Sequence, residues 1–277
     1  MLIRKLAHLS DLHLDLSPES AAVAQALVDT LLAERVDHVV VTGDLTHQGA
    51  QAEFLLFRDI FAPFINPGRL TFIPGNHDRT GEDAGGQWMD GRKVRTVETE
   101  GLYLVCVDST GLHNRNYFAC HGELSEAELD AVDTALTLAP RDTLVSVLLH
   151  HHVLPLPEES FPERLATRMG WPHAAELSLG AELVERVRGR CDLVLHGHRH
   201  VPHEIQVPQT GSRELRVYNS GSSTELGGFR IFEHADGRLL GKPAWVQAKV
   251  PTDSKPSSSN LKPALQYLAS QLGIALL

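Results

Sequence analysis

Five apolar segments of this sequence end in residues whose side chains bind metal ions. These residues are Asp11, His13, Asp44, Asn76, His150, His198 and His200. Carboxylate or amide oxygens together with imidazole nitrogens suit divalent first-row metals such as Mn, Fe, Zn or Ni, without any thiolate. In open α/β sheets, ligands bind outside the carboxyl ends of the strands. If the five segments are strands, the sequence predicts a metal site at that edge.

The spacing of these residues supports the same prediction. Asp11 and His13 are two positions apart, and such residues point to the same side of an extended chain. His198 and His200 have the same spacing, so each pair is expected to hold one ion from two directions. Three of the seven residues directly follow a glycine, which lets the backbone approach closely or adopt a positive φ.

Each residue has a structural alternative when it is taken alone, such as a turn for Asn76 or a surface position for His200. His150 begins a run of three histidines, and adjacent residues on a strand cannot all face one site. His150 follows the apolar segment directly and is assigned as the ligand, whereas His151 and His152 are assigned to packing or to support of the ligands. A chance alignment of seven such residues at five segment ends is improbable, which favours the metal site.

Strand and helix patterns alternate along the first 200 residues. The predicted strands are 3–10, 38–44, 70–75, 101–110, 143–150 and 191–198. The predicted helices are 17–37, 51–64, 125–139 and 177–190. Between residues 200 and 250 the sequence predicts further strands and no helix. This order indicates an α/β protein whose helices cover its sheets.

The C-terminal part of the sequence differs from the rest. Residues 251–260 are rich in Pro and Ser and predict a linker, and leucines at helical spacing after it predict an amphipathic helix. The expected organisation is one domain over 1–250 and a linker with a C-terminal helix over 251–277. This helix is expected to pack on the domain or on a second subunit, which would give a homo-oligomer. Docking on another protein or on a membrane surface is the alternative.

The composition limits the partners. The sequence has 25 Lys and Arg against 35 Asp and Glu, a net charge of -10, which argues against binding a nucleic-acid duplex or an anionic membrane. Its three cysteines show no CxxC spacing, so no disulfide framework is expected. We find no signal-peptide pattern and no apolar run of membrane-spanning length. A cytoplasmic location is therefore expected.

Five motifs in sequence order make this chain similar to the calcineurin-like metallophosphoesterases. They are Asp11-Leu12-His13, Gly43-Asp44, Gly75-Asn76-His77-Asp78, His150 and Gly197-His198-Arg199-His200. The resemblance covers residues 8–200 and implies a four-layer αββα sandwich of two mixed β-sheets flanked by helices. The pattern looks nearest to the bacterial cyclic-nucleotide phosphodiesterase branch. Many relatives have an acidic residue near position 47, where this sequence has His47, which we assign to a loop or to support of the ligands.

The resemblance also implies two divalent metal ions, Mn, Fe or Zn, and distributes their ligands. One ion would be held by Asp11, His13 and His200, the other by Asn76, His150 and His198, with Asp44 bridging them. Two divalent ions with two carboxylates leave the site with a charge of about +2, which attracts a phosphate. A hydroxide bridging the ions is the implied nucleophile.

His77 and Asp78 are the predicted catalytic residues. His77 is expected to face the phosphate, where it stabilises the transition state or protonates the leaving group. Asp78 is expected to orient or charge His77, or alternatively to hold the turn. The predicted function is hydrolysis of a small-molecule phosphate ester, most simply by a phosphodiesterase. The alternatives are a phosphomonoesterase and a non-catalytic scaffold, and the scaffold is disfavoured because every ligand position is filled.

Substrate choice is expected to lie in three loops beside the strand ends, 81–95, 111–123 and 155–177. Their aromatic candidates for stacking and basic candidates for phosphate contact are Trp88, Phe161, Trp171, Arg92, Arg115 and Arg164. The structural alternative for each is packing within its loop or a solvated charge.

Overall fold

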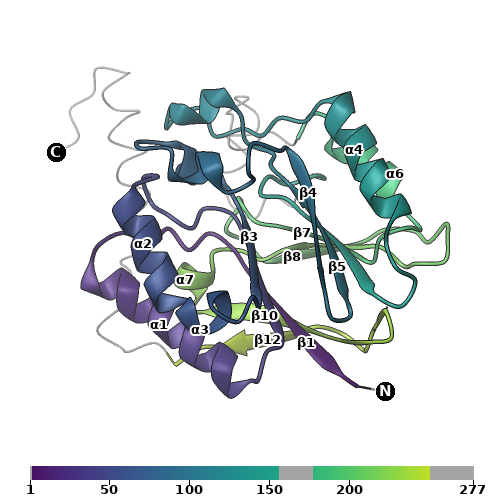
Figure 1. Ribbon diagram of the computed structural model, residues 1–277, viewed down its shortest axis with the longest axis horizontal. Coiled ribbons are helices and arrows are strands. Elements are labelled where there is room, and N and C mark those ends of the chain that lie inside the picture. Colours follow the sequence, from purple (N-terminus) through teal and green to yellow (C-terminus); the bar gives the residue numbers. More distant parts are fainter. Residues whose placement is uncertain (1, 156–176, 250–277) are drawn as a thin grey trace.

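Two mixed β-sheets lie face to face, and helices cover the outer face of each sheet (Figure 1). The computed structural model describes residues 2–155 and 177–249. The strands of the first sheet are β1 (Arg4–Leu9), β2 (His38–Thr42), β3 (Leu70–Ile73), β10 (Gly228–Ala235), β11 (Arg238–Leu239) and β12 (Ala244–Gln247). Those of the second are β4 (Val94–Thr99), β5 (Leu102–Val107), β6 (Leu144–Leu148), β7 (Leu193–His196), β8 (His203–Gln206) and β9 (Arg216–Asn219). The predicted four-layer αββα sandwich is confirmed.

The order of the strands places the parallel ones next to one another in each sheet. The first sheet runs β11-β10-β1-β2-β3, with β12 also paired to β10, and the second runs β4-β5-β6-β7-β9-β8. β1, β2 and β3 are mutually parallel, as are β5, β6 and β7. Their carboxyl ends therefore lie together, which is the arrangement that the metal-site prediction requires.

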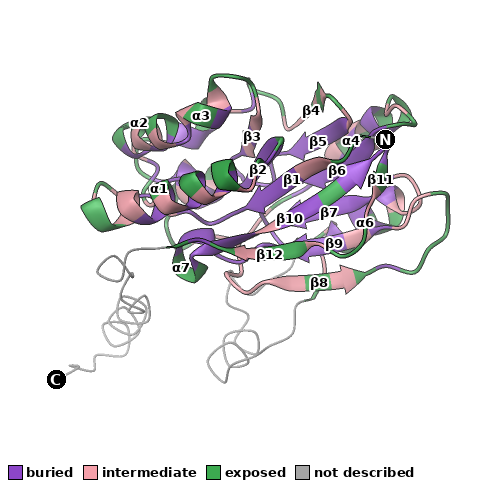
Figure 2. Ribbon diagram, turned by 90° about the horizontal axis from the view of Figure 1, so that it is seen from below, coloured by how far each residue is buried: buried purple, intermediate pink, exposed green. Residues whose placement is uncertain are grey.

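Alternating side chains of the central strands fill three apolar layers. In β2, Val39 and Val41 pack against the helices, whereas Val40 packs against the other sheet. In β5, Leu104 faces the first sheet and Val105 faces the helices. Because both faces of each sheet are covered, these strands are continuously apolar and buried, as Figure 2 shows. Rigid burial of this kind holds the strand ends in place.

The helices that cover the first sheet are α1 (Pro18–Ala33), α2 (Gln51–Ile60) and α3 (Ala62–Ile65), and those on the second are α4 (Glu126–Thr137) and α6 (Gly180–Val187). Ser17 caps α1 through Ser20 N, as the sequence predicts. The predicted helix 51–64 is divided at Phe61, since Pro63 has no N–H and cannot continue the α2 hydrogen-bond pattern.

Two short elements were not expected from the sequence. β4 is a partly exposed edge strand that pairs antiparallel with β5, and its mixed polar composition conceals it. The helix α7 (Ser223–Leu226) lies after residue 200 and is too short to show a helical period.

Some predicted features lie outside the described residues. They are the C-terminal segment 251–277 and the loop residues Phe161, Arg164 and Trp171. In the part of the chain that the structure describes, no helix combines the length and apolar character needed to span a bilayer.

His38 gives the fold a pH-dependent stability. The side chain is buried, and its Nε2 lies 2.9 Å from Thr71 Oγ1 in the neighbouring strand. Burial, and after it the charge of Arg69, lower the pKa of His38 to about 4. The same side chain in the unfolded chain has a pKa of about 6.5, so between these values the unfolded state binds more protons. Stability is therefore lost as the pH falls from 6.5 towards 4.

We expect His38→Leu to reduce this loss. Between pH 7 and pH 5 the free energy of unfolding of the variant should fall by about 2 kcal/mol less than that of the wild type, because one proton-binding group is removed from the unfolded state. Urea unfolding at both pH values measures the difference. An identical fall in both proteins would show that His38 does not contribute.

Candidate metal centre

All seven predicted ligands lie together at the carboxyl ends of five strands. They follow β1, β2 and β3 of the first sheet and β6 and β7 of the second. Six of the seven form two neighbouring groups, each held together by contacts between residues far apart in the sequence, and Asp44 lies between them.

The first group consists of Asp11, His13 and His200. Nε2 of His13 lies 3.0 Å from Nε2 of His200. Oδ1 of Asp11 lies 3.9 Å from the first of these nitrogens and 3.5 Å from the second. Two imidazole nitrogens and a carboxylate oxygen therefore face one small space.

The second group consists of Asn76, His150 and His198. Oδ1 of Asn76 lies 3.1 Å from Nε2 of His150 and 3.0 Å from Nδ1 of His198. A neutral amide oxygen and two imidazoles converge here without an anionic group of their own.

Asp44 lies between the two groups. Its Oδ2 is 3.6 Å from Nε2 of His13 in the first group and 3.3 Å from Nε2 of His150 in the second. Its other oxygen, Oδ1, accepts a hydrogen bond of 2.8 Å from the backbone N–H of His77. One oxygen is thus held by the chain, and the other faces both groups.

These donors fit two divalent cations. Nδ1 of His150 lies 2.8 Å from the carbonyl oxygen of Thr42, which holds the proton on that nitrogen and leaves the Nε2 lone pair for the centre. Burial holds the pKa of His13 and of His198 well below the usual range, so both rings are neutral and able to act as ligands. None of the residue groups that could hold a metal within the described residues includes a cysteine.

The negative charge of the buried Asp44 carboxylate also favours a positive charge beside it. Burial lowers the pKa of His150, but the nearby Asp44 carboxylate has the larger combined effect and raises it to about 9. A proton on His150 then supplies the charge that a cation would otherwise supply. Nitrogen and oxygen donors with this demand suit divalent cations better than a soft metal.

The backbone at the ligands differs from the sequence-based expectation. Five of the nine non-glycine residues with positive φ in the described chain are predicted ligands: Asp11, His13, Asp44, His198 and His200. The chain is therefore not extended at these positions, and the expectation that each i, i+2 pair holds one ion is wrong for the second pair. His198 joins Asn76, whereas His200 joins His13.

His77 and Asp78 follow Asn76 in a single 3-10 turn, η1 (His77–Arg79). Nδ1 of His77 lies 2.8 Å from the carbonyl oxygen of His47, so this carbonyl, rather than Asp78, sets the orientation of the ring. The Asp78 carboxylate accepts hydrogen bonds from the backbone of Leu45 and Thr46, from the Thr46 hydroxyl and from Gly75 N. These bonds favour the turn interpretation of Asp78 over the catalytic one.

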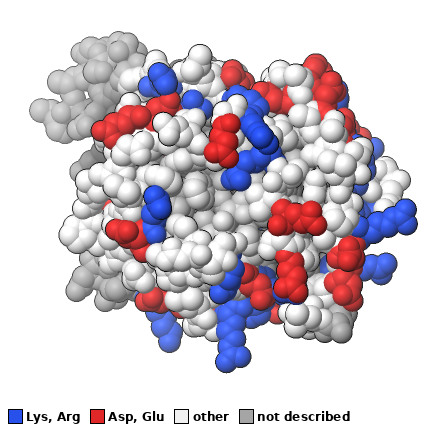
Figure 3. All heavy atoms as spheres, viewed as in Figure 1, with Lys and Arg blue, Asp and Glu red and all other residues white. Residues whose placement is uncertain are grey.

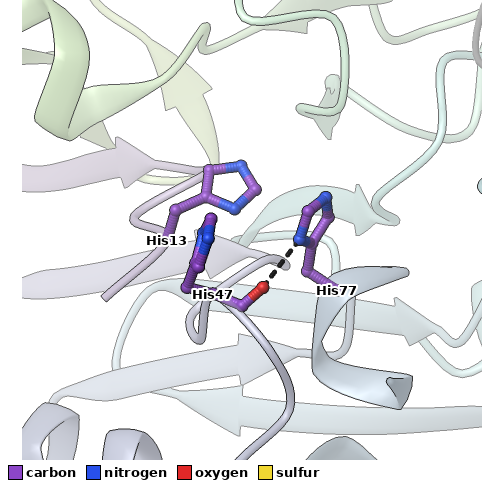
Figure 4. Close-up of side chains that lie close together, drawn as sticks. All are labelled: His13, His47 and His77. Carbon is purple, nitrogen blue, oxygen red and sulfur yellow. Dashed lines mark hydrogen bonds between the residues drawn. The ribbon is translucent and has the colours of Figure 1, made fainter. Parts of the chain in front are cut away.

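The ring of His47 also reaches the centre. Figure 4 shows His13, His47 and His77 gathered together, and one nitrogen of each lies within 4.8 Å of the others. The ring centroids of His47 and His77 are 6.0 Å apart. Of the two predicted roles of His47, a loop residue or support of the ligands, this position favours the second.

The histidines next to His150 support the ligands. Nδ1 of His151 lies 2.8 Å from Ser109 Oγ, and its Nε2 lies 3.0 Å from the carbonyl oxygen of Cys120. The ring of His152 stacks on that of His198, with centroids 5.9 Å apart. Both arrangements agree with the assignment to packing or support.

Two of the loop residues that were candidates for substrate contact, Trp88 and Arg115, contact other side chains. Trp88 packs against Phe54 and Phe72, with ring centroids 4.6 and 5.3 Å apart, so it belongs to the core rather than to the substrate side. Arg115 forms an ion pair of 2.5 Å with Asp83. Tyr117, which the sequence analysis did not single out, is the aromatic residue that lies against His77.

The backbone of Gly75 lies so close to Asp44 that there is no room for a side chain. A Cβ at this position would overlap Oδ1 and the backbone N of Asp44. We therefore expect Gly75→Ala to displace the carboxylate and to leave fewer than two metal ions per folded chain, measured by elemental analysis after dialysis. Gly68→Ala is the control for backbone strain, because φ at Gly68 is +71° whereas a Cβ there meets nothing within 4 Å. Full metal content in Gly75→Ala would contradict the placement of Asp44 between the ions.

Comparisons with known proteins agree with this geometry. Residues 4–202 match the family model described as calcineurin-like phosphoesterase. The 3',5'-cyclic adenosine monophosphate phosphodiesterase CpdA of Escherichia coli (strain K12) is 30% identical over 220 residues, which are 73% of this chain and 72% of that protein. The protein of the same name from Haemophilus influenzae is 29% identical over 211 residues, which are 71% of this chain and 69% of that protein.

A solved structure supports the fold. A dimetal phosphatase from Danio rerio has a TM-score of 0.57 at 13% identity, and the match covers 89% of this chain and 99% of that one. The matched family model extends over most of the chain and contains all seven predicted ligands. The chain therefore belongs to the calcineurin-like phosphoesterase family and is a metallophosphoesterase.

Proposed function

We propose that this protein is a dinuclear-metal phosphodiesterase, and that residues 1–250 form its catalytic domain. The observation that carries the proposal is the position of Asp44 between two complete donor groups, with His77 bonded to the same carboxylate. The two CpdA relatives named above make cyclic nucleotides the first substrates to test.

In the proposal, Asp11, His13 and His200 hold one ion, Asn76, His150 and His198 hold the other, and Asp44 is shared. Divalent ions held by these residues would supply Lewis acidity towards a phosphoryl group and would make a bound water acidic enough to act as a nucleophile near neutral pH. The chain contributes the placement of these donors and of His77. No thiolate is used.

The backbone prepares His77 for a role at the substrate. The carbonyl oxygen of His47 holds the proton on Nδ1, so Nε2 is the atom that remains for the phosphate or the leaving oxygen. A positively charged ring at this position would stabilise the negative charge that develops on the phosphoryl group or protonate the leaving alkoxide. Asp78 holds the turn that places this ring.

The surface charge is consistent with a small substrate. The net charge is -10, and Figure 3 shows acidic and basic side chains interspersed on the face in view. A nucleic-acid duplex would require an extended basic surface. A small phosphate ester needs only the local positive charge of the metal centre.

Hydrolysis of bis(p-nitrophenyl) phosphate and of p-nitrophenyl phosphate tests the proposal. We expect faster turnover of the diester by protein with about two metal ions per chain, and hydrolysis of 3',5'-cyclic AMP by the same preparation. Preference for the monoester would identify a phosphomonoesterase instead. Failure to take up metal after reloading would overturn the mechanism.

His77→Ala tests the role of the imidazole. We expect turnover to fall by about 10²- to 10⁴-fold with metal content unchanged, because His77 is not among the ligands. The loss should be larger for 3',5'-cyclic AMP, whose alkoxide leaves poorly, than for bis(p-nitrophenyl) phosphate. His203→Ala in β8, outside the metal-centre groups, is the control and should behave as the wild type. Undiminished cleavage of the cyclic nucleotide by His77→Ala would exclude the general-acid role.

A further inference from the structure

Hydrogen bonds near both ends hold the loop that contains Tyr117, residues 111–123, beside the metal centre. Arg79, in the same turn as His77, donates a hydrogen bond of 2.8 Å from Nη1 to Thr110 Oγ1 at one end of the loop. His151, next to the ligand His150, binds the carbonyl oxygen of Cys120 at the other end. The loop therefore has a defined position beside the centre.

Further contacts shape the inside of this loop. Asn114 accepts a hydrogen bond from Gly111 N and donates one to the carbonyl oxygen of His121, at 2.7 and 3.1 Å. His113 also contacts this carbonyl, at 2.7 Å. These bonds hold the two arms of the loop together, and Tyr117 lies between the arms in the sequence.

Tyr117 presents an aromatic face beside the predicted catalytic imidazole. Its ring centroid lies 5.2 Å from that of His77, with the rings at 78° to each other. The side chain is 52% exposed, and the neighbouring Phe118 is 56% exposed. A large aromatic side chain that is partly in solvent and in edge contact with a catalytic group has surface available for a ligand.

The Tyr117 hydroxyl remains protonated at neutral pH. Burial raises the pKa of Tyr117, and the negative charge of Asp44 raises it further. The residue is therefore a neutral aromatic ring with a hydrogen-bond donor, and it does not add an anion that would repel a phosphate.

We propose that Tyr117 determines substrate class by stacking on an aromatic group of the phosphodiester, namely the base of a nucleotide whose phosphate contacts His77. The inference rests on the proposed function and extends it to the organic part of the substrate. Trp88, one of the three aromatic candidates for stacking in the sequence, packs against the core instead. Every nucleobase has a π face, so a single tyrosine favours nucleotides without selecting one base.

The test compares two competitive inhibitors of diester hydrolysis, adenosine 5'-monophosphate and ribose 5-phosphate. They share the phosphate and the sugar and differ in the base, so the ratio of their inhibition constants reports the contribution of the base alone. We expect adenosine 5'-monophosphate to bind about tenfold more tightly to the wild type, within the range of base–aromatic stacking.

Variants of Tyr117 separate the ring from the hydroxyl. Tyr117→Phe should keep the ratio, whereas Tyr117→Leu should reduce it to about one, a loss of the stacking contribution. Trp245→Leu, at a partly exposed aromatic residue of β12, is the control and should leave the ratio unchanged. Metal content of each variant, measured as for the wild type, confirms an intact centre.

The outcomes distinguish the two proposals. A wild type that prefers the monoester overturns the proposed function, and the two inhibitor constants can then still be measured against p-nitrophenyl phosphate. A diesterase that binds both inhibitors equally, or that keeps its preference in Tyr117→Leu, overturns the stacking inference alone. Loss of the preference in Tyr117→Phe would assign the effect to the hydroxyl and also contradict stacking.

Discussion

The carboxylate of Asp44 is the interaction on which the arrangement of the site depends. One of its oxygens is fixed by the backbone of His77, and the other faces donor nitrogens from both sheets. A buried carboxylate surrounded by imidazoles requires compensating positive charge. A pair of divalent cations satisfies this requirement, and the polypeptide contributes the geometry in which one anion can serve both.

Each sheet has an apolar layer packed against both of its faces, and this packing makes the geometry possible. Positive φ angles at five ligand positions cost free energy, of the order of 1–2 kcal/mol for each non-glycine residue. Such positions persist only where the surrounding structure determines them. The strands that precede them are buried on both faces, so the strand ends cannot relax. Core packing is thus connected directly to the presentation of the ligands.

Residues around the ligands hold His77, its turn and the neighbouring loop in position. The carbonyl of His47 orients His77, the carboxylate of Asp78 closes the turn below it, and His151 links the centre to the loop of Tyr117. The loop of Tyr117 and the metal centre therefore belong to one hydrogen-bonded framework. A local positive centre in an acidic protein is compatible with the phosphoester substrate that the family implies.

The sequence predicted an α/β protein with seven candidate ligands at strand ends, and its resemblance to the metallophosphoesterases implied the four layers. Apolar runs of strand length followed by His, Asp and Asn are local patterns, and the order of the motifs restricts them to one family. The division of helix 51–64, the edge strand β4 and the short helix α7 were not predictable with the same certainty, because short or polar elements lack a clear period.

Only the tertiary structure decided how the ligands and their neighbours meet. The positive φ angles direct His198 and His200 to different groups, a division that the family resemblance implied and that the extended-chain argument missed. Trp88 and Tyr117 are both aromatic loop residues in the sequence, yet one packs in the core and the other lies against His77. Strand ends and residue types are encoded locally, whereas side-chain neighbours depend on contacts between distant segments, and these exist only in the folded chain.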